Sequence, residues 1–257
     1  MLFSSKYIKP PLKTLSDIEE IVKNVTNITE LGESTEAHEN YALCLFLIIG
    51  FIKSKLVLPI EFIKREAPDF LLTLGDEQII GLEHTIATTE KYKMDVKIFE
   101  KYPKGSLLEL PYYSPNQKLP KKSRIAMRRP GEKLQSAGWG DYGMEKDWIL
   151  IISNTINQKT EDLNKKQYEK FQSNELIVED ESHVSSQKRL GKSISMLKEN
   201  RLHLIREARL EFDKVHLITE RHLIYNVFGE ALETSIRKNE LYELWRQHVR
   251  SLNGRNK

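Results

Sequence analysis

The chain has 257 residues, of which 39% are hydrophobic and 30% are charged, and this length suits one large domain or two small ones. A chain of this size can bury a core without disulfides or a structural metal, and its single cysteine excludes a disulfide framework and any zinc site with two or more thiolates. The net charge of +3 is too small to attract nucleic acid to the whole molecule, so that partner can be argued only from a local cluster of charge.

The first 32 residues predict an N-terminal extension. Pro10-Pro11 and several lysines favour either an extended arm or a late-packing strand over residues 1–13, and residues 16–30 have the composition of a short helix. Gly32 marks the break at which we expect this extension, residues 1–32, to end.

A long apolar helix is predicted over residues 36–55, where apolar residues recur at helical spacing and Ser34 or Thr35 provides an N-cap. Cys44 lies inside it and is expected to be a small core residue. The uncharged stretch 41–52 is shorter than the about 20 residues that a membrane span needs, and it begins too far from the N-terminus for a secretory signal. We therefore expect a cytoplasmic protein with no membrane partner.

The following segments change from helical to strand periodicity. Residues 69–74 and 78–85 are apolar runs joined by a glycine-containing turn, which predicts a β-hairpin. Residues 100–145 are expected to form a long, basic loop region rich in proline and glycine. After it we expect a helix over 144–171, a strand over 175–178, a helix from about 190 to 208, strands over 214–219 and 222–227, and a C-terminal helix. This order predicts a single α/β domain over residues 1–257, with a mixed central sheet flanked by helices.

Two carboxylates of the predicted hairpin are candidates for chemistry. Asp69 follows Pro68 at the start of the first strand and Glu83 lies near the end of the second, so the two can meet at one end of the sheet. Neighbouring carboxylates repel each other unless a cation lies between them, and oxygen ligands of this kind suit Mg²⁺ or Mn²⁺. The alternative interpretation keeps Asp69 as a turn residue and Glu83 as an edge-strand charge.

Pro68-Asp69 followed by Glu83-His84-Thr85 resembles the motif of the PD-(D/E)xK nuclease superfamily. The resemblance implies a restriction-endonuclease-like core of order α-β-β-β-α-β, and a metal ion held by Asp69 and Glu83. By element order it extends over residues 36–219. Thr85 stands where the motif has a lysine, so the group that orients the attacking water has to come from elsewhere or is missing.

In some members of this superfamily the lysine has moved to a later helix, and Lys159 is the candidate for that role here. It lies on the apolar stripe of the helix predicted over 144–171, where an ammonium needs a carboxylate or a route to water. The alternative is a rim lysine paired with Asp162. A glutamate of the first helix completes the metal site in many members, which indicates Glu39, with Glu36 as the competitor and a solvated helix charge as the alternative.

A basic cluster lies within the predicted loop region. Residues 118–133 contain seven basic residues and one acidic residue, a local charge of 7 − 1 = +6. Such a segment could bind phosphates, with Trp139, Tyr112 or Tyr113 stacking on bases, or it could be a solvated loop. The residues predicted to bind nucleic acid are Lys121, Lys122, Arg124, Arg128 and Arg129.

Other patterns predict structure rather than chemistry. His38 and His84 are expected to be packed or surface histidines, and the acidic run 179–181 is expected to be a solvated loop. The chain contains no GxxxxGK[ST], GxGxxG, HExxH or GxSxG pattern, which removes the usual support for P-loop, Rossmann, zincin and α/β-hydrolase chemistry.

The residues and the resemblance together predict a metal-dependent nuclease that hydrolyses phosphodiester bonds with Mg²⁺ or Mn²⁺, with DNA favoured over RNA by analogy. The second interpretation, which Thr85 favours, is a nuclease-like fold that no longer cuts and acts as a nucleic-acid-binding or protein-interaction module. Many members of the superfamily dimerise, which leaves a homodimer open.

Overall fold

The computed structural model divides the chain into two compact units. Unit 1 comprises Met1–Thr85, Lys159–Glu179 and Leu210–Lys257, and unit 2 comprises Ile86–Gln158 and Asp180–Arg209. The residues that the structure describes are 10–26, 34–99, 101–102, 104–109, 113, 127–133, 143–165, 169–182, 190–207, 212–220, 222–224, 226–228 and 235–254.

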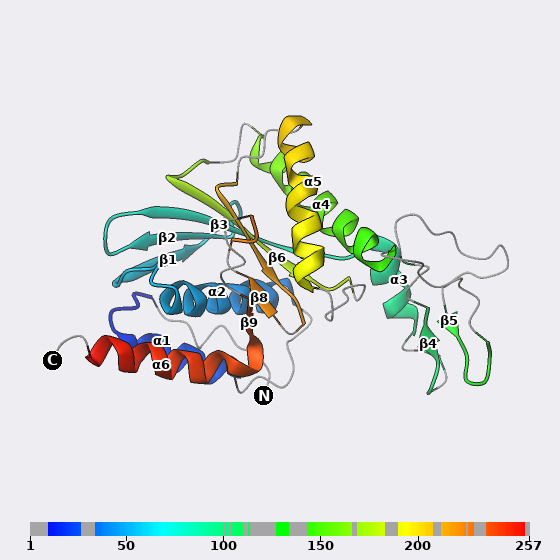
Figure 1. Ribbon diagram of the computed structural model, residues 1–257, viewed down its shortest axis with the longest axis horizontal. Coiled ribbons are helices and arrows are strands. Elements are labelled where there is room, and N and C mark those ends of the chain that lie inside the picture. The colour runs from blue at the N-terminus through cyan, green and yellow to red at the C-terminus, as the bar shows by residue number, and fades with distance from the viewer. Residues whose placement is uncertain are drawn as a thin grey trace. The chain divides into compact units, whose positions relative to one another are not determined.

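Unit 1 is built around helix α2, Thr35–Ile52, whose N-terminus is capped by Ser34. The Ser34 hydroxyl oxygen accepts a hydrogen bond from the backbone N–H of Ala37 at 3.2 Å, which satisfies one of the orphan donors of the first turn. The helix is buried along most of its length because the sheet covers one side, and helices α1 (Leu15–Thr26) and α6 (Leu241–Gly254) cover the other (Figure 1). The predicted helix, its cap and the burial of Cys44 are confirmed.

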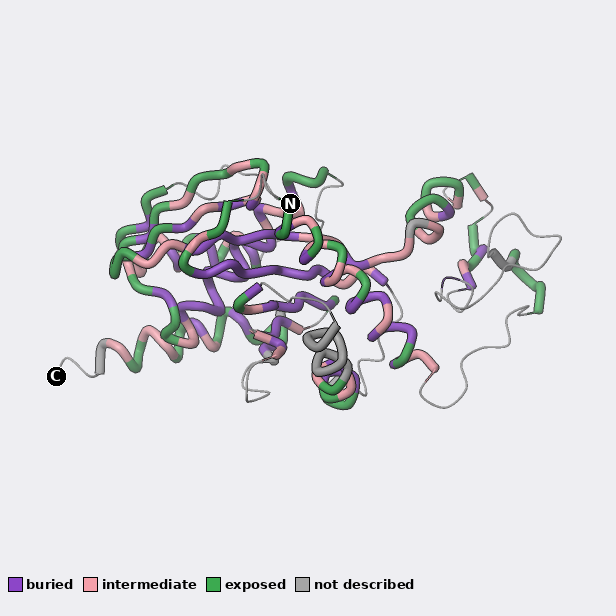
Figure 2. Tube along the Cα trace, turned by 90° about the horizontal axis from the view of Figure 1, so that it is seen from above, coloured by how far each residue is buried: buried purple, intermediate pink, exposed green. Residues whose placement is uncertain are grey.

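A mixed, open sheet of seven strands packs against α2, in the order β1-β2-β3-β6-β7-β8-β9. Its members are β1 (Ile60–Lys64), β2 (Phe70–Leu74), β3 (Ile79–Ala87), β6 (Ser173–Asp180), β7 (Lys214–Ile218), β8 (His222–Ile224) and β9 (Ser235–Arg237). Most residues of the central strands β3, β6 and β7 are buried, and Figure 2 shows buried segments side by side in the middle of the sheet. With six α-helices among the described residues, the fold is α/β, as the sequence predicts at this level.

The strand directions place the hairpin beside the later strands. β1 pairs with β2 and β2 with β3 in antiparallel register, whereas β6 pairs with β7 in parallel. The Gln172 side chain accepts a hydrogen bond from the backbone N–H of Ile79, and further along both strands the side chain of His84 meets that of Glu179. β3 and β6 therefore run in the same direction, so residues near the C-terminal ends of both strands lie close together.

The remaining elements differ in part from the sequence prediction. They are α3 (Glu90–Phe99), β4 (Leu107–Leu108), β5 (Met127–Arg128), α4 (Gly143–Leu163), α5 (Leu190–Glu207) and the short 3₁₀ helix η4 (Lys238–Glu240). The sequence reading did not identify β1, α3 or β9, and it extended the helix over 144–171 eight residues too far. Only short pieces of the region 100–145 belong to the described residues, and they include β4 and β5, which pair with each other.

A buried ion cluster fixes β6 to β7 inside unit 1. The Glu175 carboxylate accepts hydrogen bonds from Lys214 Nζ at 2.6 Å and from His216 Nε2 at 2.8 Å, and its side chain is fully buried. Burial by itself raises the pKa of Glu175, but the hydrogen bond and charge of His216 and the charge of Lys214 outweigh burial and lower it to about 2. This cluster is a structural feature of the strand pair, well paired and ionised.

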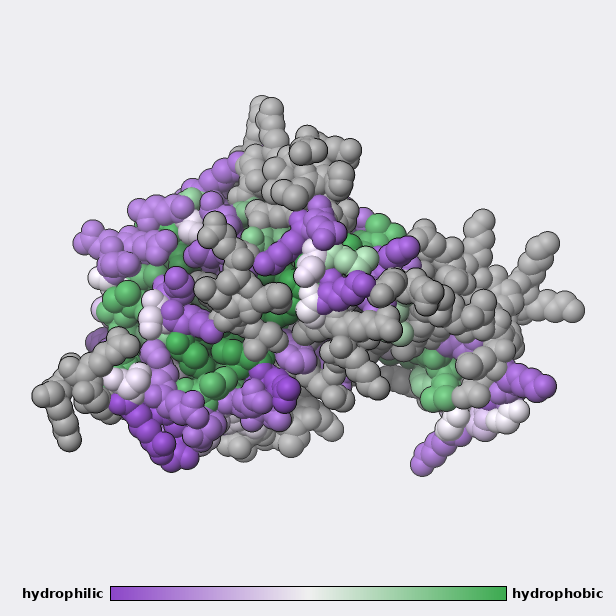
Figure 3. Space-filling model, viewed as in Figure 1, coloured by the Kyte–Doolittle hydropathy of each residue, from purple (hydrophilic) through white to green (hydrophobic). Residues whose placement is uncertain are grey.

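The surface of the described residues is ordinary for its composition. Figure 3 shows hydrophilic side chains over α6 and over the strand ends at the left of the view, with apolar side chains between them. In the part of the chain that the structure describes, every helix is too short or too polar to cross a membrane.

Candidate functional site

Asp69 and Glu83 lie side by side in unit 1. The β2–β3 register pairs Phe70 with Leu82, which places Asp69, just before β2, opposite Glu83 on β3. The backbone N–H of His84 donates a hydrogen bond to Asp69 Oδ2 at 2.7 Å. Burial and the neighbouring negative charge of Glu83 raise the pKa of Asp69 to about 6, against the opposing effect of the His84 N–H. The two carboxylates therefore share one electrostatic environment, in which negative charge is in excess.

Lys159 reaches the same place from α4. Its ammonium lies 2.5 Å from Glu83 Oε1, and the side chains of Lys159 and Glu83 are 27% and 7% exposed. Burial tends to lower the pKa of Lys159, but the Glu83 carboxylate outweighs burial and raises it, so the ammonium keeps its proton. Lys159 forms its ion pair with Glu83, and the carboxylate of Asp162 pairs with Lys165.

Glu39 contributes a third carboxylate from the second turn of α2. After burial and the charge of Glu83, its negative charge also raises the pKa of Asp69. Glu39 Oε2 also lies 2.9 Å from Lys64 Nζ, at the end of β1 next to the hairpin. The competing residue Glu36 is exposed in the first turn of α2.

Thr85 stands on the same face of β3 as Glu83, because side chains two residues apart point to the same side of a strand. Thr85 carries no charge, and the lysine that pairs with Glu83 comes from α4. β3 supplies the glutamate of the motif but not its lysine, and the lysine next to this glutamate is Lys159.

The acidic run 179–181 is not a solvated loop, and this correction concerns Glu179 above all. Glu179 belongs to β6 and is 7% exposed, because the strand continues two residues beyond its predicted end. Its Oε2 atom lies 3.0 Å from His38 Nδ1 and 3.2 Å from His84 Nε2. An ionised carboxylate can only accept hydrogen bonds, so both of these ring nitrogens carry hydrogen.

The histidine contacts keep Glu179 ionised. Burial raises the pKa of Glu179, but the hydrogen bonds and positive charge from His38 and His84 outweigh burial and lower it to about 2. Of the two alternatives expected for the histidines, packed or at the surface, His84 is packed, with 6% of it exposed. Their joint contact with one carboxylate oxygen was missed. The available signal was the repeated pairing of histidine and glutamate in His38-Glu39 and Glu83-His84.

Two groups of side chains have the chemistry of cation ligands. His38 and Glu179, together with Glu181 two residues further along the chain, make up a His/Glu/Glu group that could hold a metal ion. Asp69, Glu83 and Glu39 offer oxygen ligands only, which is the donor set that Mg²⁺ and Mn²⁺ prefer. Their donor chemistry suits a divalent ion, but among the described residues only the His38, Glu179 and Glu181 group has ligand atoms that all lie within 4.8 Å of one another, so an ion shared by Asp69, Glu83 and Glu39 is a proposal.

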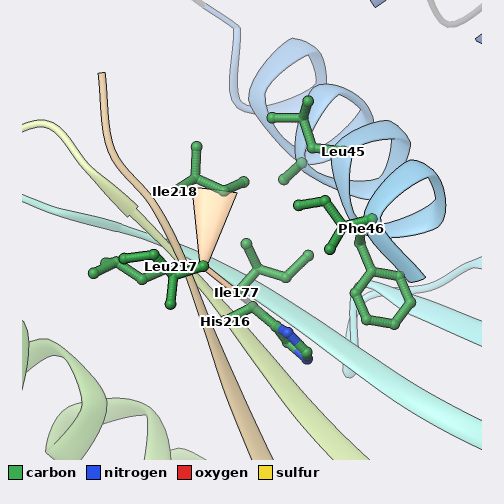
Figure 4. Close-up of a pocket in the computed structure, with 9 residues that line it drawn as sticks. Leu45, Phe46, Ile177, His216, Leu217 and Ile218 are labelled. Carbon is green, nitrogen blue, oxygen red and sulfur yellow. The ribbon is translucent and has the colours of Figure 1, made fainter. Parts of the chain in front are cut away.

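One cavity opens elsewhere in unit 1 and does not belong to this site. It has a volume of about 10 Å³ and lies between α2 and strands β6, β7 and β8, with Leu45, Phe46 and His216 in its lining (Figure 4). That volume is near the lower limit for a single water molecule. The cavity is therefore too small to hold a ligand larger than water.

Most of the predicted nucleic-acid contacts cannot be placed. Lys121, Lys122 and Arg124 lie outside the described residues, as do Tyr112 and Trp139. Arg128 is on β5, and Arg129 follows it and is exposed.

The stacking role fails for Tyr113. This side chain is 2% exposed and packs against Tyr92 and Leu108, and its hydroxyl donates to Asp95 Oδ2 at 2.9 Å. A ring packed in this way presents no free face to a base, so any stacking has to come from other aromatic residues.

Comparisons of the chain with protein-family models, with curated proteins and with solved structures gave no match. The function therefore has to be inferred from the geometry of the site.

Proposed function

We propose that the protein is a metal-dependent nuclease of the PD-(D/E)xK kind, which hydrolyses phosphodiester bonds in DNA with Mg²⁺ or Mn²⁺. One observation carries this proposal: Asp69, Glu83 and Lys159 converge from a hairpin and a helix that lie far apart in the sequence. Glu39 approaches the same place from α2. Two neighbouring carboxylates beside one half-buried lysine, with Glu39 as the candidate third carboxylate, form the kind of set that metal-assisted phosphodiester hydrolysis needs.

The order of the elements also supports the proposal. Within it α2, β1, β2, β3, α4 and β6 form the restriction-endonuclease-like core, and α3, β4 and β5 are an insertion between β3 and α4. The antiparallel β2–β3 hairpin carries Asp69 and Glu83, and Lys159, which follows the insertion in the sequence, pairs with Glu83. The lysine that the strand lacks at Thr85 is replaced from the helix.

Each side chain has a defined task in this mechanism. Asp69, Glu83 and Glu39 would hold the divalent ion, which when bound polarises a phosphodiester oxygen and lowers the pKa of an attacking water. Lys159 keeps its proton, so it can hold that water by hydrogen bonding and stabilise the negative charge that develops on the phosphate oxygens. Glu83 positions the ammonium through their ion pair.

The direct test is metal-dependent nicking of supercoiled plasmid DNA by the purified full-length chain. We expect relaxed and linear products with Mg²⁺ or Mn²⁺ and none with EDTA. If DNA is retained in a gel-shift experiment but remains intact with either metal, the protein is a binding module that no longer cuts. Neither cleavage nor retention would remove both interpretations.

The basic cluster of unit 2 leads to a separate prediction on affinity. Replacing Arg128 and Arg129 together by Gln should flatten the dependence of log K on log salt by about two units, because each phosphate contact contributes about one. The measurement is fluorescence anisotropy of a labelled duplex between low and moderate salt. Lys97→Gln together with Lys101→Gln, outside the cluster, removes the same charge from the chain and serves as the control. Equal slopes for the two double variants would contradict phosphate binding by Arg128 and Arg129.

A further inference from the structure

Glu179 connects three residues of the proposed metal site without belonging to it. Its Oε2 atom contacts His38, the residue before Glu39 on α2, and His84, the residue after Glu83 on β3. The backbone N–H of His84 in turn donates to Asp69 Oδ2 at 2.7 Å. One buried carboxylate is thus two steps from each of the three proposed ligands, a hydrogen bond to a histidine followed by a covalent or hydrogen-bonded link.

The two histidines point away from the ligands they accompany, because consecutive side chains are about 100° apart on a helix and alternate between the two faces of a strand. On β3, His84 and Glu83 point to opposite faces, because successive side chains of a strand alternate. Fixing the imidazole of His84 on one face therefore fixes the backbone that presents Glu83 on the other and aims the N–H at Asp69. The contact of His38 with the same oxygen, at 3.0 Å, sets the first turns of α2 against β6.

We propose that Glu179 is a positioning residue of the metal site, which holds Asp69, Glu83 and Glu39 in register through His38 and His84. This inference rests on the proposed function and extends it to the supporting residues. Partners of this kind, which bind the neighbours of metal ligands, typically change metal affinity by about 10- to 100-fold when removed. The reason is that each carboxylate must otherwise be ordered as the ion binds.

The test measures binding of Mn²⁺ alone, by isothermal titration calorimetry, to the wild-type chain and to Glu179→Leu. Leucine has a similar volume and accepts no hydrogen bond, so we expect Kd to rise by about 10- to 100-fold. Glu179→Gln retains an oxygen that both histidines can reach and should bring Kd back to within about threefold of wild type. A Gln variant that binds Mn²⁺ as weakly as the Leu variant would instead identify Glu179 as a ligand, in the group it forms with His38 and Glu181, and would overturn the positioning role. His38→Ala removes one of the two contacts at a partly exposed helix start, and it replaces Glu179→Leu if that variant does not fold.

Glu175→Leu is the matched control, because Glu175 lies on the same strand and also pairs with a histidine and a lysine. Both leucine variants lose a buried, ion-paired carboxylate, so both should melt at lower temperature. Only the change at Glu179 should weaken Mn²⁺ binding, and an equal loss in both variants would overturn the positioning role. Unchanged Kd in folded Glu179→Leu would overturn it as well, while the nuclease proposal stands. A wild-type chain that binds no Mn²⁺ would instead remove the metal site itself.

Discussion

Lys159→Met is expected to lower metal-dependent DNA cleavage by at least about 10²- to 10³-fold without unfolding the protein. Methionine keeps the length and apolar stem of the side chain, so α4 retains its packing while the ammonium is lost. At saturating Mg²⁺ the loss should appear in kcat rather than in KM, because the proposed task of the ammonium is to hold water and to stabilise charge in the transition state. The measurement is a cleavage time course with saturating metal and DNA.

Lys159→Met should also change the thermal stability of the protein, which is a second and independent readout. Without Lys159, Glu83 loses its 2.5 Å ion pair, so the metal-free protein should melt at lower temperature, and Mg²⁺ should restore part of the difference. Lys165→Met is the control, since Lys165 pairs with Asp162 at the exposed end of α4. Cleavage by Lys159→Met at the wild-type rate would remove the catalytic assignment of this residue.

The parts of the fold that could be predicted from the sequence are those whose stability is local. Helix α2 has an apolar face repeated over several turns and a serine cap, and the β2–β3 hairpin has two apolar runs around a tight turn. Each pattern can be recognised in a short window, because the residues that stabilise the element lie inside it.

Strand β1 could not be predicted in this way, for a physical reason. Only Ile60 of its five residues is fully buried, and Ile63 is 63% exposed, so its pattern is weak. It is a strand because β2 pairs with it along its whole length and because Leu12 bonds to Ile60 on the other edge. Pairing between separated segments decides such a strand, and a single window does not show it.

In the candidate site, too, local patterns indicated some residues, whereas contacts between distant segments could not be predicted. Asp69 and Glu83 are joined by one hairpin, and Lys159 stood out as a charge on an apolar stripe. The contacts of Glu179 with His38 and His84 span 141 and 95 residues of sequence, so no spacing rule indicates them. The prediction of a solvated acidic run was wrong because a local excess of charge says nothing about a distant partner that neutralises it.

Asp69→Asn should abolish cleavage and at the same time stabilise the metal-free protein. Loss of a ligand removes several kcal/mol of transition-state stabilisation, which corresponds to at least about 10³-fold in rate. Yet the carboxylate of Asp69 is held next to Glu83 and Glu39, and its pKa of about 6 means that ionisation is unfavourable in the folded state. Asparagine carries no charge and still offers an oxygen to the backbone N–H of His84, so the repulsion disappears and the hydrogen bond remains.

The stabilisation by Asp69→Asn should depend on pH, because Asp69 has different pKa values in the folded and unfolded states. The pKa of Asp69 is about 6 in the folded state against 3.8 as the ordinary value, so the wild-type protein loses stability as pH rises from below 4 to above 6. The advantage of Asn over Asp should therefore be absent at pH 3.5 and reach about 1–2 kcal/mol above pH 6.5, after allowing for partial exposure. Thermal unfolding in EDTA across this range measures it, with Asp76→Asn in the exposed β2–β3 turn as the control.

Added Mg²⁺ should reverse the order of the two proteins at neutral pH. A cation that binds the folded wild-type site stabilises it in proportion to the logarithm of its concentration above Kd, and Asp69→Asn gains little because its site has lost a charged ligand. We expect the wild-type protein to be less stable than the variant in EDTA and more stable than it in excess Mg²⁺, because its charged ligands bind the cation. An order that stays the same in both conditions would show that Asp69 is strained for some other reason, and that the carboxylates do not share an ion.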